Sequence, residues 1–168
     1  MYYFAYGSNM SSRRLRQRLG AARAVAVARL PRHRLCWHKQ GRDGSGKCDA
    51  APTGDPGHAV LGVLYDVAAV QRALLDRVEG VGAGYEAIEV GLLLDTGSTV
   101  AAFTYRATLI DADTLPFHWY KTHVLRGARE HGLPEEYIAR LEAVPSRDDP
   151  DRERQRRELL IYQPGALG

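Results

Sequence analysis

Glu79 is the carboxylate best placed in the sequence for acid–base chemistry. The apolar spacing predicts a helix over residues 67–78, and Glu79 stands at its C-terminal end, directly before Gly80. Carbonyl dipoles at a helix C-terminus disfavour a negative charge, and Val78 and Val81 would disfavour it further if they bury the carboxylate. Both effects make a carboxylate a better proton acceptor near neutral pH. An exposed helix-end glutamate without a role is the alternative, and position alone favours it.

A glycine-centred bend follows the first apolar segment and could hold an anion. Residues 2–6 are aromatic and apolar, which is typical of a buried strand, and Gly7, Ser8 and Asn9 come directly after them. Glycine allows positive φ and a close approach of a ligand to the backbone, and successive backbone N–H groups in such a bend form an anion-binding hollow. An ordinary strand-to-helix turn explains the same residues equally well.

Metal and nucleotide sites are not predicted. Cys36 and His38 would share one face of a strand while His33 would point to the other, and Cys48 belongs to no Cys-x-x-Cys pair. The sequence has no Gly-x-Gly-x-x-Gly, P-loop or Gly-x-Ser-x-Gly pattern. We therefore expect a site without metal or cofactor, and two free thiols.

The elements that would position these residues are strands first and helices later. Strands are expected over residues 2–6, 22–30, 32–38, 59–65, 85–94 and 99–108. Helices are expected over residues 11–19, 67–78, 114–130 and from Pro134 onward. This order predicts an α+β domain over residues 1–168 with a curled sheet or barrel. Residues 146–168 would be a charged C-terminal extension: a surface helix with an apolar end that docks, then a loose tail.

Two of the expected helices have a defined start or apolar face. Asp66 is the expected N-cap of the helix before Glu79. Its apolar face should contain Val67, Val70, Leu74 and Val78. Tyr120 lies on the apolar face of the helix over residues 114–130, where a core tyrosine is the default interpretation and its hydroxyl needs a partner.

Charge and hydropathy limit the expected partners. The first 42 of the 168 residues contain ten basic and no acidic residues, so they carry +10 and the remainder −7. No base-reading or stacking motif accompanies this stretch, so we expect the acidic remainder to fold against it and no nucleic-acid partner. No apolar run reaches the length of a membrane span and the N-terminus lacks a secretory signal, which predicts a cytoplasmic location and no membrane partner.

Several segments together resemble a known family. Residues 3–10, Tyr-Phe-Ala-Tyr-Gly-Ser-Asn-Met, resemble the opening signature of the γ-glutamylcyclotransferases and their AIG2-like relatives. Residues 78–81, 84–85 and 88–90 resemble the family's catalytic-glutamate segment. Its C-terminal helical segment is resembled by residues 119–121, 127–128, 132–134, 136–137 and 141. Each motif is short, but their order and spacing over residues 2–144 make the match specific.

The resemblance implies an α+β fold, a small mixed β-barrel of the γ-glutamylcyclotransferase type with flanking helices. It also implies a cofactor-free reaction, a small γ-glutamyl substrate, and Glu79 as the catalytic acid/base. The substrate-binding residues that it implies are Tyr3, Phe4, Ala5, Tyr6, Gly7, Ser8, Asn9 and Tyr120. A homodimer is left open.

The implied reaction converts γ-glutamyl amino acids or γ-glutamyl amides to 5-oxoproline and a free amine. The Tyr6-Gly7-Ser8-Asn9 bend is closer to the γ-glutamyl-amino-acid type than to the γ-glutamylamine or glutathione types. Three alternatives stay open: an AIG2-like domain that binds a small anion without turnover, a biosynthetic enzyme that removes γ-glutamyl protecting groups, as bacterial members of this shape can, and a nucleic-acid-binding protein that uses the basic N-terminal stretch. Steep salt-dependent binding of DNA or RNA would support the last of these. Glu79 argues against the first, because an inert binder of an anion gains nothing from a carboxylate in its pocket.

Overall fold

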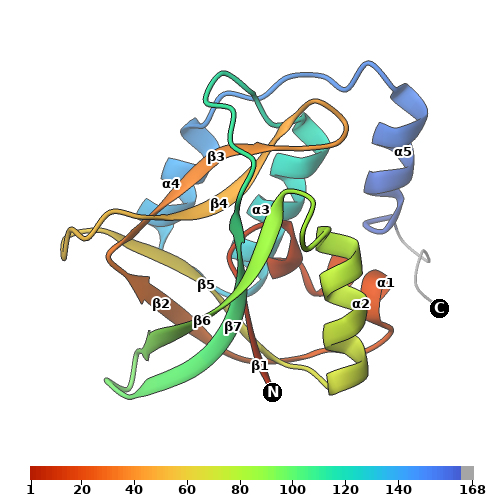
Figure 1. Ribbon diagram of the computed structural model, residues 1–168. Helices are drawn as coiled ribbons and strands as arrows, with labels where there is room; N and C mark the ends of the chain where they lie inside the picture. Colours follow the sequence, from red (N-terminus) through yellow and green to blue (C-terminus); the bar gives the residue numbers. More distant parts are fainter. Residues whose placement is uncertain (164–168) are drawn as a thin grey trace.

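A closed five-stranded barrel forms the centre of the computed structural model, which describes residues 1–163. The strands are β1 (Tyr2–Ala5), β2 (Arg23–Pro31), β3 (His33–Gln40), β4 (Gly46–Pro52), β5 (Ala59–Asp66), β6 (Tyr85–Leu94) and β7 (Thr99–Ala107). The order around the barrel is β1-β5-β2-β6-β7, and β1 closes it by pairing antiparallel with β5 and parallel with β7. β3 and β4 form a separate antiparallel hairpin, so the sheet in Figure 1 is a mixed barrel with one appended ribbon.

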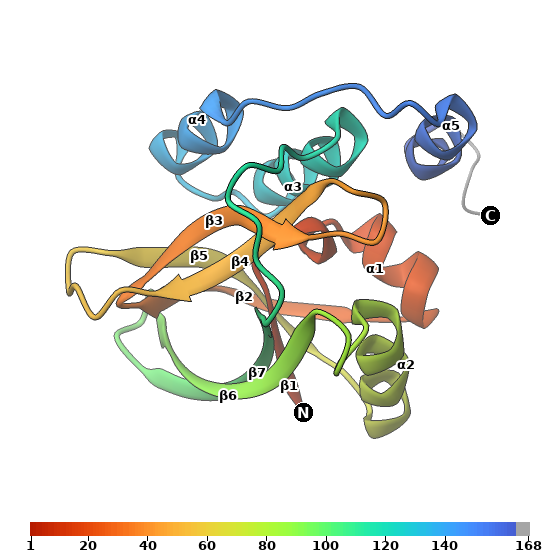
Figure 2. The same cartoon turned by 45° about the horizontal axis from the view of Figure 1, so that its top comes forward.

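Five α-helices flank the strands within residues 1–163. They are α1 (Ser12–Leu19), α2 (Ala69–Glu79), α3 (His118–Glu130), α4 (Glu135–Ala143) and α5 (Arg152–Leu160). Figure 2 shows α3, α4 and α5 in one layer beyond the β3–β4 hairpin, whereas α2 stands beside the barrel near α1. None of the helices within residues 1–163 is long and apolar enough to cross a membrane. The mixed barrel with flanking helices confirms the expected α+β fold.

β1 lies in the core because its side chains are apolar and because a glycine on the neighbouring strand β5 has no side chain to collide with it. Tyr3, Phe4 and Ala5 are at most 4% exposed. Gly62 of β5 faces them, and a Cβ there would lie 2.8 Å from the Phe4 ring and would collide with the carbonyl oxygen of Ala5. The missing side chain lets β5 approach β1 closely. The bend that follows β1 is thereby held against a rigid barrel.

α1 begins and ends at the residues that the sequence indicates. The Ser11 hydroxyl accepts a hydrogen bond from the N–H of Arg14 at 3.5 Å, which is a long N-cap contact. Gly20 ends the helix with a φ of 77°, a conformation that costs little only for glycine. Both ends of α1 are thus defined, and its residues Arg14 and Arg18 contact Ser8 and Asn9 of the bend before it.

The start of α2 differs from the expected one. Asp66 is not its N-cap, because the pairing of β5 continues through Asp66, whose carboxylate binds Arg23 and the N-terminal ammonium. The helix begins at Ala69 instead, and the Gln71 side chain accepts a hydrogen bond from the Ala68 N–H at 2.8 Å. The prediction was wrong because strand pairing, a long-range interaction, decided where the helix could begin.

The buried face of α2 also differs. Leu75 is fully buried against the barrel, whereas Val70 and Val78, placed on the expected apolar face, are 70% and 47% exposed. Only Val67 and Leu74 of that face pack against the core. The contact with the barrel, and not the valine spacing, sets the rotation of the helix.

β4 and the start of α3 were not anticipated. β4 contains no β-branched residue and exists through its ladder with β3; at its first position, Gly46, a Cβ would collide with the carbonyl oxygen of Trp37. α3 begins at His118, four residues after the expected start, because residue 117 is extended (φ −73°, ψ 150°) directly after Pro116. At the other end of the chain, Ile161 after α5 is 4% exposed, so this apolar end does dock; the expected loose tail over residues 164–168 lies outside the described residues.

Candidate active site

Glu79, the bend after β1 and Tyr120 meet around one cavity. The cavity has about 300 Å³ of empty space, part of it open to solvent, which is at the lower end for ligand pockets. Its lining is Tyr3, Tyr6, Gly7, Ser8, Asn9, Cys48, Glu79, Tyr85, Thr104, Tyr105 and Tyr120. We call it the inner cavity. Seven of the nine site residues expected from the sequence therefore lie together.

Phe4 and Ala5 are the two exceptions. Both are buried in the barrel, at 0% and 1% exposed, and neither lines the inner cavity. The Phe4 ring packs against Gly62, and the carbonyl oxygen of Phe4 accepts a hydrogen bond from the Thr104 hydroxyl at 2.8 Å. These two residues hold β1 in the barrel, and their expected contact with a ligand stays a prediction.

Glu79 is the last residue of α2. Gly80 ends the helix in the left-handed conformation, with φ 72° and ψ 50°, and its N–H donates to the carbonyl oxygen of Asp76. This helix end agrees with the prediction from the sequence. It directs Glu79, whose side chain is 17% exposed, to the border of the inner cavity.

One oxygen of Glu79 is anchored by two donors. Oε1 accepts hydrogen bonds from Asn9 Nδ2 and from Arg18 Nη1, both at 2.8 Å. Arg18 Nη1 also donates to Asn9 Oδ1 at 2.7 Å, so the three side chains form a closed triangle. Oε2 accepts no hydrogen bond from residues 1–163. The carboxylate is thus oriented through one oxygen while the other is left for a ligand.

The condition under which Val78 and Val81 would disfavour the charge of Glu79, namely that they bury it, is not met. Val78 and Val81 are 47% and 41% exposed and do not cover the carboxylate. Its neighbours are instead a cation, Arg18, and an amide, Asn9. The reason is the rotation of α2, which buries Leu75 and turns the end of the helix toward α1.

Gly7 is required by close packing and not by a positive φ. Its φ is −118°, outside the left-handed region, contrary to the expectation from the sequence. A Cβ at Gly7 would lie 3.0 Å from Cys48 Cβ and 3.1 Å from the Tyr120 hydroxyl oxygen. The backbone next turns into one 3₁₀ turn over Ser8–Met10, whose first N–H has no acceptor within the turn. The bend therefore exposes backbone to the inner cavity.

Three tyrosines around the inner cavity use their hydroxyl protons within the protein. Tyr6 donates to the carbonyl oxygen of Tyr105, Tyr85 donates to that of Cys48 at 2.6 Å, and Tyr105 donates to Asp76 Oδ1 at 2.7 Å. These contacts join the bend after β1 to β7, β6 to β4, and β7 to α2 around the cavity.

Two other tyrosine hydroxyls accept hydrogen bonds from neighbouring groups within residues 1–163. The Tyr3 hydroxyl accepts from Asn9 Nδ2 at 2.9 Å, and the Tyr120 hydroxyl accepts from the Cys48 N–H at 3.0 Å. Burial raises the pKa of both Tyr3 and Tyr120 well above the ordinary value, so both hydroxyls are neutral donors at physiological pH. Tyr120 is thus both a core residue, at 6% exposed, and part of the cavity wall.

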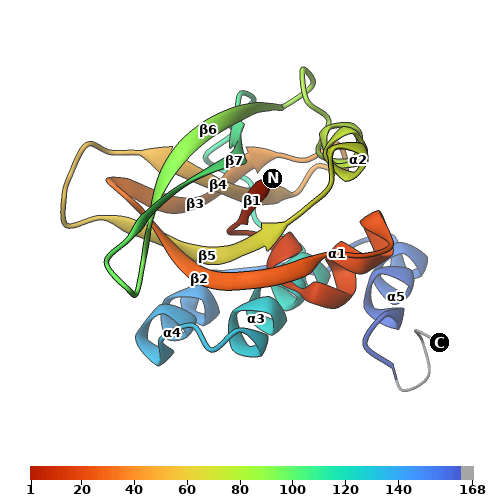
Figure 3. The same ribbon diagram turned by 90° about the horizontal axis from the view of Figure 1, so that it is seen from below.

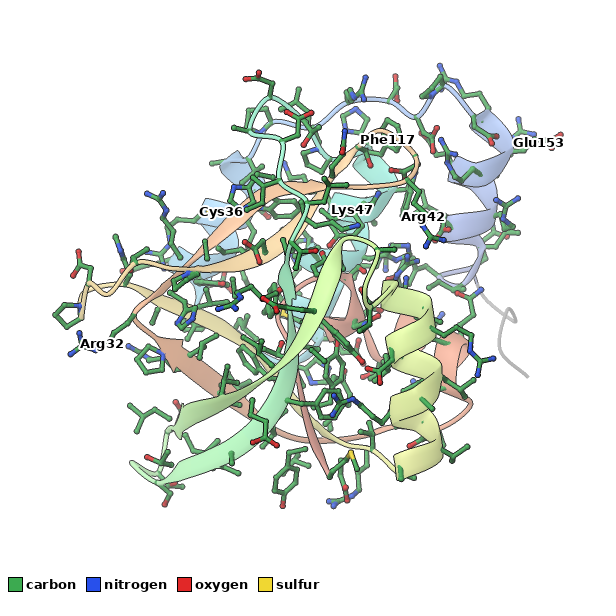
Figure 4. The ribbon with its side chains drawn as sticks, viewed as in Figure 1. Arg32, Cys36, Arg42, Lys47, Phe117 and Glu153 are labelled. Atoms are coloured by element: carbon green, nitrogen blue, oxygen red, sulfur yellow. The ribbon has the colours of Figure 1, made fainter. Side chains whose placement is uncertain are left out.

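A larger hollow adjoins the inner cavity, and we call it the basic chamber. It has about 800 Å³ of empty space, partly open to solvent, and shares Ser8, Glu79, Tyr85 and Tyr120 with the inner cavity. Its charged lining is Arg14, Arg18, Lys39, Arg42, Lys47, Asp43 and Glu79. Figure 4 shows Lys47 on β4 and Arg42 in the loop before it, near the C-terminal end of α2.

These cations were not singled out from the sequence. The four-residue spacing of Arg14 and Arg18 on an expected helix was an available signal, because such residues share a face. No local pattern marks Lys39 or Lys47, which the β3–β4 hairpin brings to the site.

Arg14 connects the bend to the C-terminal part of the chain. Its guanidinium donates to the Ser8 hydroxyl at 3.2 Å, to His123 Nε2 at 2.8 Å and to Glu158 on α5 at 2.5 Å. Burial lowers the pKa of His123 to about 4, so the imidazole is neutral and accepts this bond. Burial opposes ionisation of Glu158, but the charge and the hydrogen bond of Arg14 oppose this effect and favour the carboxylate, so the pKa of Glu158 is lowered. Figure 3 shows α5 beside α1, as this contact requires.

The expected distribution of charge is found in part. Arg14, Arg18 and Arg23 each pair with a carboxylate of the later, acidic part of the chain. Among residues 1–163, no three His, Cys, Asp or Glu side chains are arranged to hold a metal ion. His38 instead contacts Asp49, at 2.9 Å between Nε2 and Oδ2.

Comparisons with known proteins identify relatives of this chain. Residues 59–141 match the AIG2-like family. Human γ-glutamylcyclotransferase is 33% identical over 150 residues, which cover 87% of this chain and 79% of the human protein. The mouse protein of the same name is 33% identical over 146 residues, covering 84% and 77%.

Solved structures show the same relationship. One of a γ-glutamyl cyclotransferase superposes with a TM-score of 0.85 at 30% identity, covering 96% of this chain and 97% of its own. A yeast enzyme specific to glutathione, at 12% identity and a TM-score of 0.63, shares the fold. The curated relatives are mammalian, so they lend no support to the bacterial deprotecting alternative. Because one-third of the residues are identical to a relative over most of both chains, this chain belongs to the γ-glutamylcyclotransferase family.

Proposed function

We propose that the protein is an enzyme that cyclises γ-glutamyl amino acids or γ-glutamyl amides to 5-oxoproline with release of the amine, using Glu79 as the acid/base. The observation that carries the proposal is the state of Glu79. Its Oε1 is held by Arg18 and Asn9, its Oε2 has no partner among residues 1–163, and it lies where two cavities meet. A carboxylate so oriented can accept a proton without losing its position.

The substrate would lie across both cavities. The γ-glutamyl group fits the inner cavity, where the Tyr3 and Tyr120 hydroxyls offer protons and the bend at Gly7 and Ser8 offers backbone N–H groups. The amine half would then extend past Glu79 into the basic chamber. This pose places the amide nitrogen and the α-ammonium of the substrate near the same carboxylate.

Glu79 would move protons in both halves of the reaction. It takes one proton from the α-ammonium, and the resulting amine attacks the γ-carbonyl carbon to form a five-membered ring. Protonated Glu79 then donates to the leaving nitrogen, and the C–N bond breaks. The ring nitrogen loses its surplus proton as the released amine takes one up, so two protons pass from the attacking to the leaving nitrogen. Since both reacting groups belong to one molecule, the protein mainly has to hold the folded substrate.

The oxyanion formed by the attack needs hydrogen-bond donors. The backbone N–H groups of Gly7 and Ser8 are the candidates, because the first N–H of a helical turn has no acceptor within it. Tyr120 is a further neutral side-chain donor, since its hydroxyl oxygen would lie 3.1 Å from a Cβ placed on Gly7. Fixed donors of this kind stabilise a developing negative charge without reorganisation.

A substrate panel tests the proposal. The protein is incubated with γ-glutamyl dipeptides, γ-glutamylamines, glutathione and a γ-glutamyl-protected amine, and 5-oxoproline is measured by chromatography. We expect release from at least one class and almost none from the Glu79→Gln variant. Binding of these compounds without any 5-oxoproline would support the non-catalytic binding domain and contradict the proposal.

A further inference from the structure

Lys39 is a buried ammonium without an anionic partner. It is 6% exposed, lines the basic chamber, and forms no ion pair or hydrogen bond with residues 1–163. Burial lowers the pKa of Lys39, and the more distant carboxylates of Glu79 and Asp43 offset this effect only in part. Its Nζ lies 4.7 Å from the centre of the Tyr85 ring, a contact that only partly replaces water. A buried charge is costly unless it is paired. An ammonium in this position therefore indicates a binding site for an anion.

The fold makes room for this lysine in a specific way. Gly84, with a φ of 126°, lies against the end of the side chain, and a Cβ there would be 3.0 Å from both Cε and Nζ of Lys39. β3 extends through Gln40, and Lys39 also bridges to Ile110, so its backbone is held from two sides. Burial lowers the pKa of Lys39, and an anion bound beside it would oppose that shift.

Most other cations of the basic chamber are already neutralised. Arg14 pairs with Glu158, Arg18 pairs with Glu79, and Lys47 pairs with Asp43 at 2.8 Å.

Arg42 resembles Lys39 in having no carboxylate partner among residues 1–163. It is exposed at the rim, and its Nη2 would lie 3.5 Å from a Cβ placed on Gly80, next to Glu79. Lys39 and Arg42 thus leave two positive charges unbalanced in the chamber.

We infer that the basic chamber binds the leaving half of the substrate and selects a leaving amino acid that is itself acidic, with Lys39 and Arg42 each binding one of its two carboxylates. This inference rests on the proposed function. A γ-glutamyl group in the inner cavity puts the scissile amide at Glu79, which both cavities share, so the leaving half enters the basic chamber. An aspartate or glutamate leaving group carries two carboxylates, which equal the two unbalanced cations in number and are opposite to them in charge.

A charge series of leaving groups tests the inference. The substrates are γ-glutamyl-ethylamide, γ-glutamyl-alanine and γ-glutamyl-glutamate, whose leaving halves carry zero, one and two carboxylates. We expect kcat/KM to rise along the series, by about 10-fold or more for the first carboxylate and less for the second, which meets the exposed Arg42. Rising salt should reduce the advantage of γ-glutamyl-glutamate.

Lys39→Met tests the residue itself, because methionine keeps most of the apolar stem and removes the charge. The preference for γ-glutamyl-glutamate over γ-glutamyl-ethylamide should fall by about 10- to 100-fold. Arg34→Met is the matched control, since it removes one exposed positive charge from the same strand and does not line the chamber. The Arg34→Met variant should prefer γ-glutamyl-glutamate over γ-glutamyl-ethylamide as strongly as the unmodified protein does.

The outcomes separate the two hypotheses. Release of 5-oxoproline without dependence on leaving-group charge, or an equal loss for all three substrates in Lys39→Met, would overturn the inference and leave the proposed function standing. No release from any substrate would overturn both. If Lys39→Met does not fold, as judged by its melting temperature, the ranking of the three substrates by the unmodified protein decides alone.

Discussion

Replacement of Glu79 by glutamine separates its chemical role from its structural one. Glutamine keeps the length of the side chain and an oxygen that can still accept from Asn9 and Arg18, which now lie at 2.8 Å from Oε1. It cannot accept a proton from an ammonium. Glu79→Gln should therefore preserve binding of γ-glutamyl ligands while removing acid–base catalysis.

The structure sets the size of both effects. General acid–base groups contribute roughly 10²–10⁴-fold in rate, or about 3–5 kcal/mol, and Glu79 would serve both the attacking and the leaving nitrogen. The structural cost is smaller: Arg18, whose side chain is 20% exposed, loses its anionic partner but keeps a neutral acceptor. This should lower the free energy of unfolding by about 1–3 kcal/mol, a few degrees in melting temperature for each kcal/mol. Expressed as free energies, the rise in the activation barrier should exceed the loss of folding stability.

The assay is the initial rate of 5-oxoproline release at 25 °C, with melting temperatures measured on the same samples. Glu89→Gln is the matched control, because Glu89 is exposed on β6 and lines neither cavity. Glu86→Gln, which breaks only a half-exposed pair with Arg106, should cost at most about 1 kcal/mol of stability and no turnover. A folded Glu79→Gln variant with turnover near that of the unmodified protein would refute the mechanism, even though the family assignment would stand.

Three further predictions follow from the same contacts. Tyr120→Phe and Tyr137→Phe each remove a hydroxyl that accepts from a buried strand N–H, so both variants should lose about 1–3 kcal/mol of stability. Only Tyr120→Phe should also lower kcat/KM, by about 5- to 30-fold. If the two variants had the same kcat/KM as the unmodified protein, the role of Tyr120 would be structural only. Gly7→Ala places a methyl 3.1 Å from the Tyr120 hydroxyl and should impair turnover, whereas Gly91→Ala, with its nearest atom at 3.8 Å, should not; the 5-oxoproline assay compares them. Burial lowers the pKa of His123 from 6.5 to about 4, so between these pH values His123 is protonated in the unfolded chain and neutral in the folded one. The free energy of unfolding should thus fall by about 3 kcal/mol between pH 6.5 and 4, measured by urea unfolding; His123→Gln should flatten that decline, and an equally steep decline would contradict the assignment.

Local signals predicted the elements that carry the site. An aromatic run followed by Gly7 predicted β1 and the bend, and Gly80 after an apolar helix predicted the helix end at Glu79. Both signals depend on the backbone preferences of adjacent residues, so they can be read within a few positions. The resemblance to the family depended on the same short segments.

Contacts between distant segments were beyond such signals. Gly7 is required by Cys48 and Tyr120, which reach it from β4 and α3, and not by its own φ. β4 itself has a composition unlike a strand and forms because β3 supplies its hydrogen bonds. For the same reason α2 was expected to bury the wrong face: barrel packing, which the helix sequence does not contain, chose Leu75.

The sequence by itself determined which residue types stand at the ends of elements, and thereby the bend and a carboxylate at the end of a helix. The tertiary structure alone decided the partners of that carboxylate. Arg18 is 61 residues from Glu79 along the chain, and Lys39 is 40 residues away, yet both line the same chamber. Closure of the barrel and pairing of the β3–β4 hairpin bring them together. The physical reason is that backbone conformation follows from neighbours in the chain, whereas the charge around a group follows from neighbours in space.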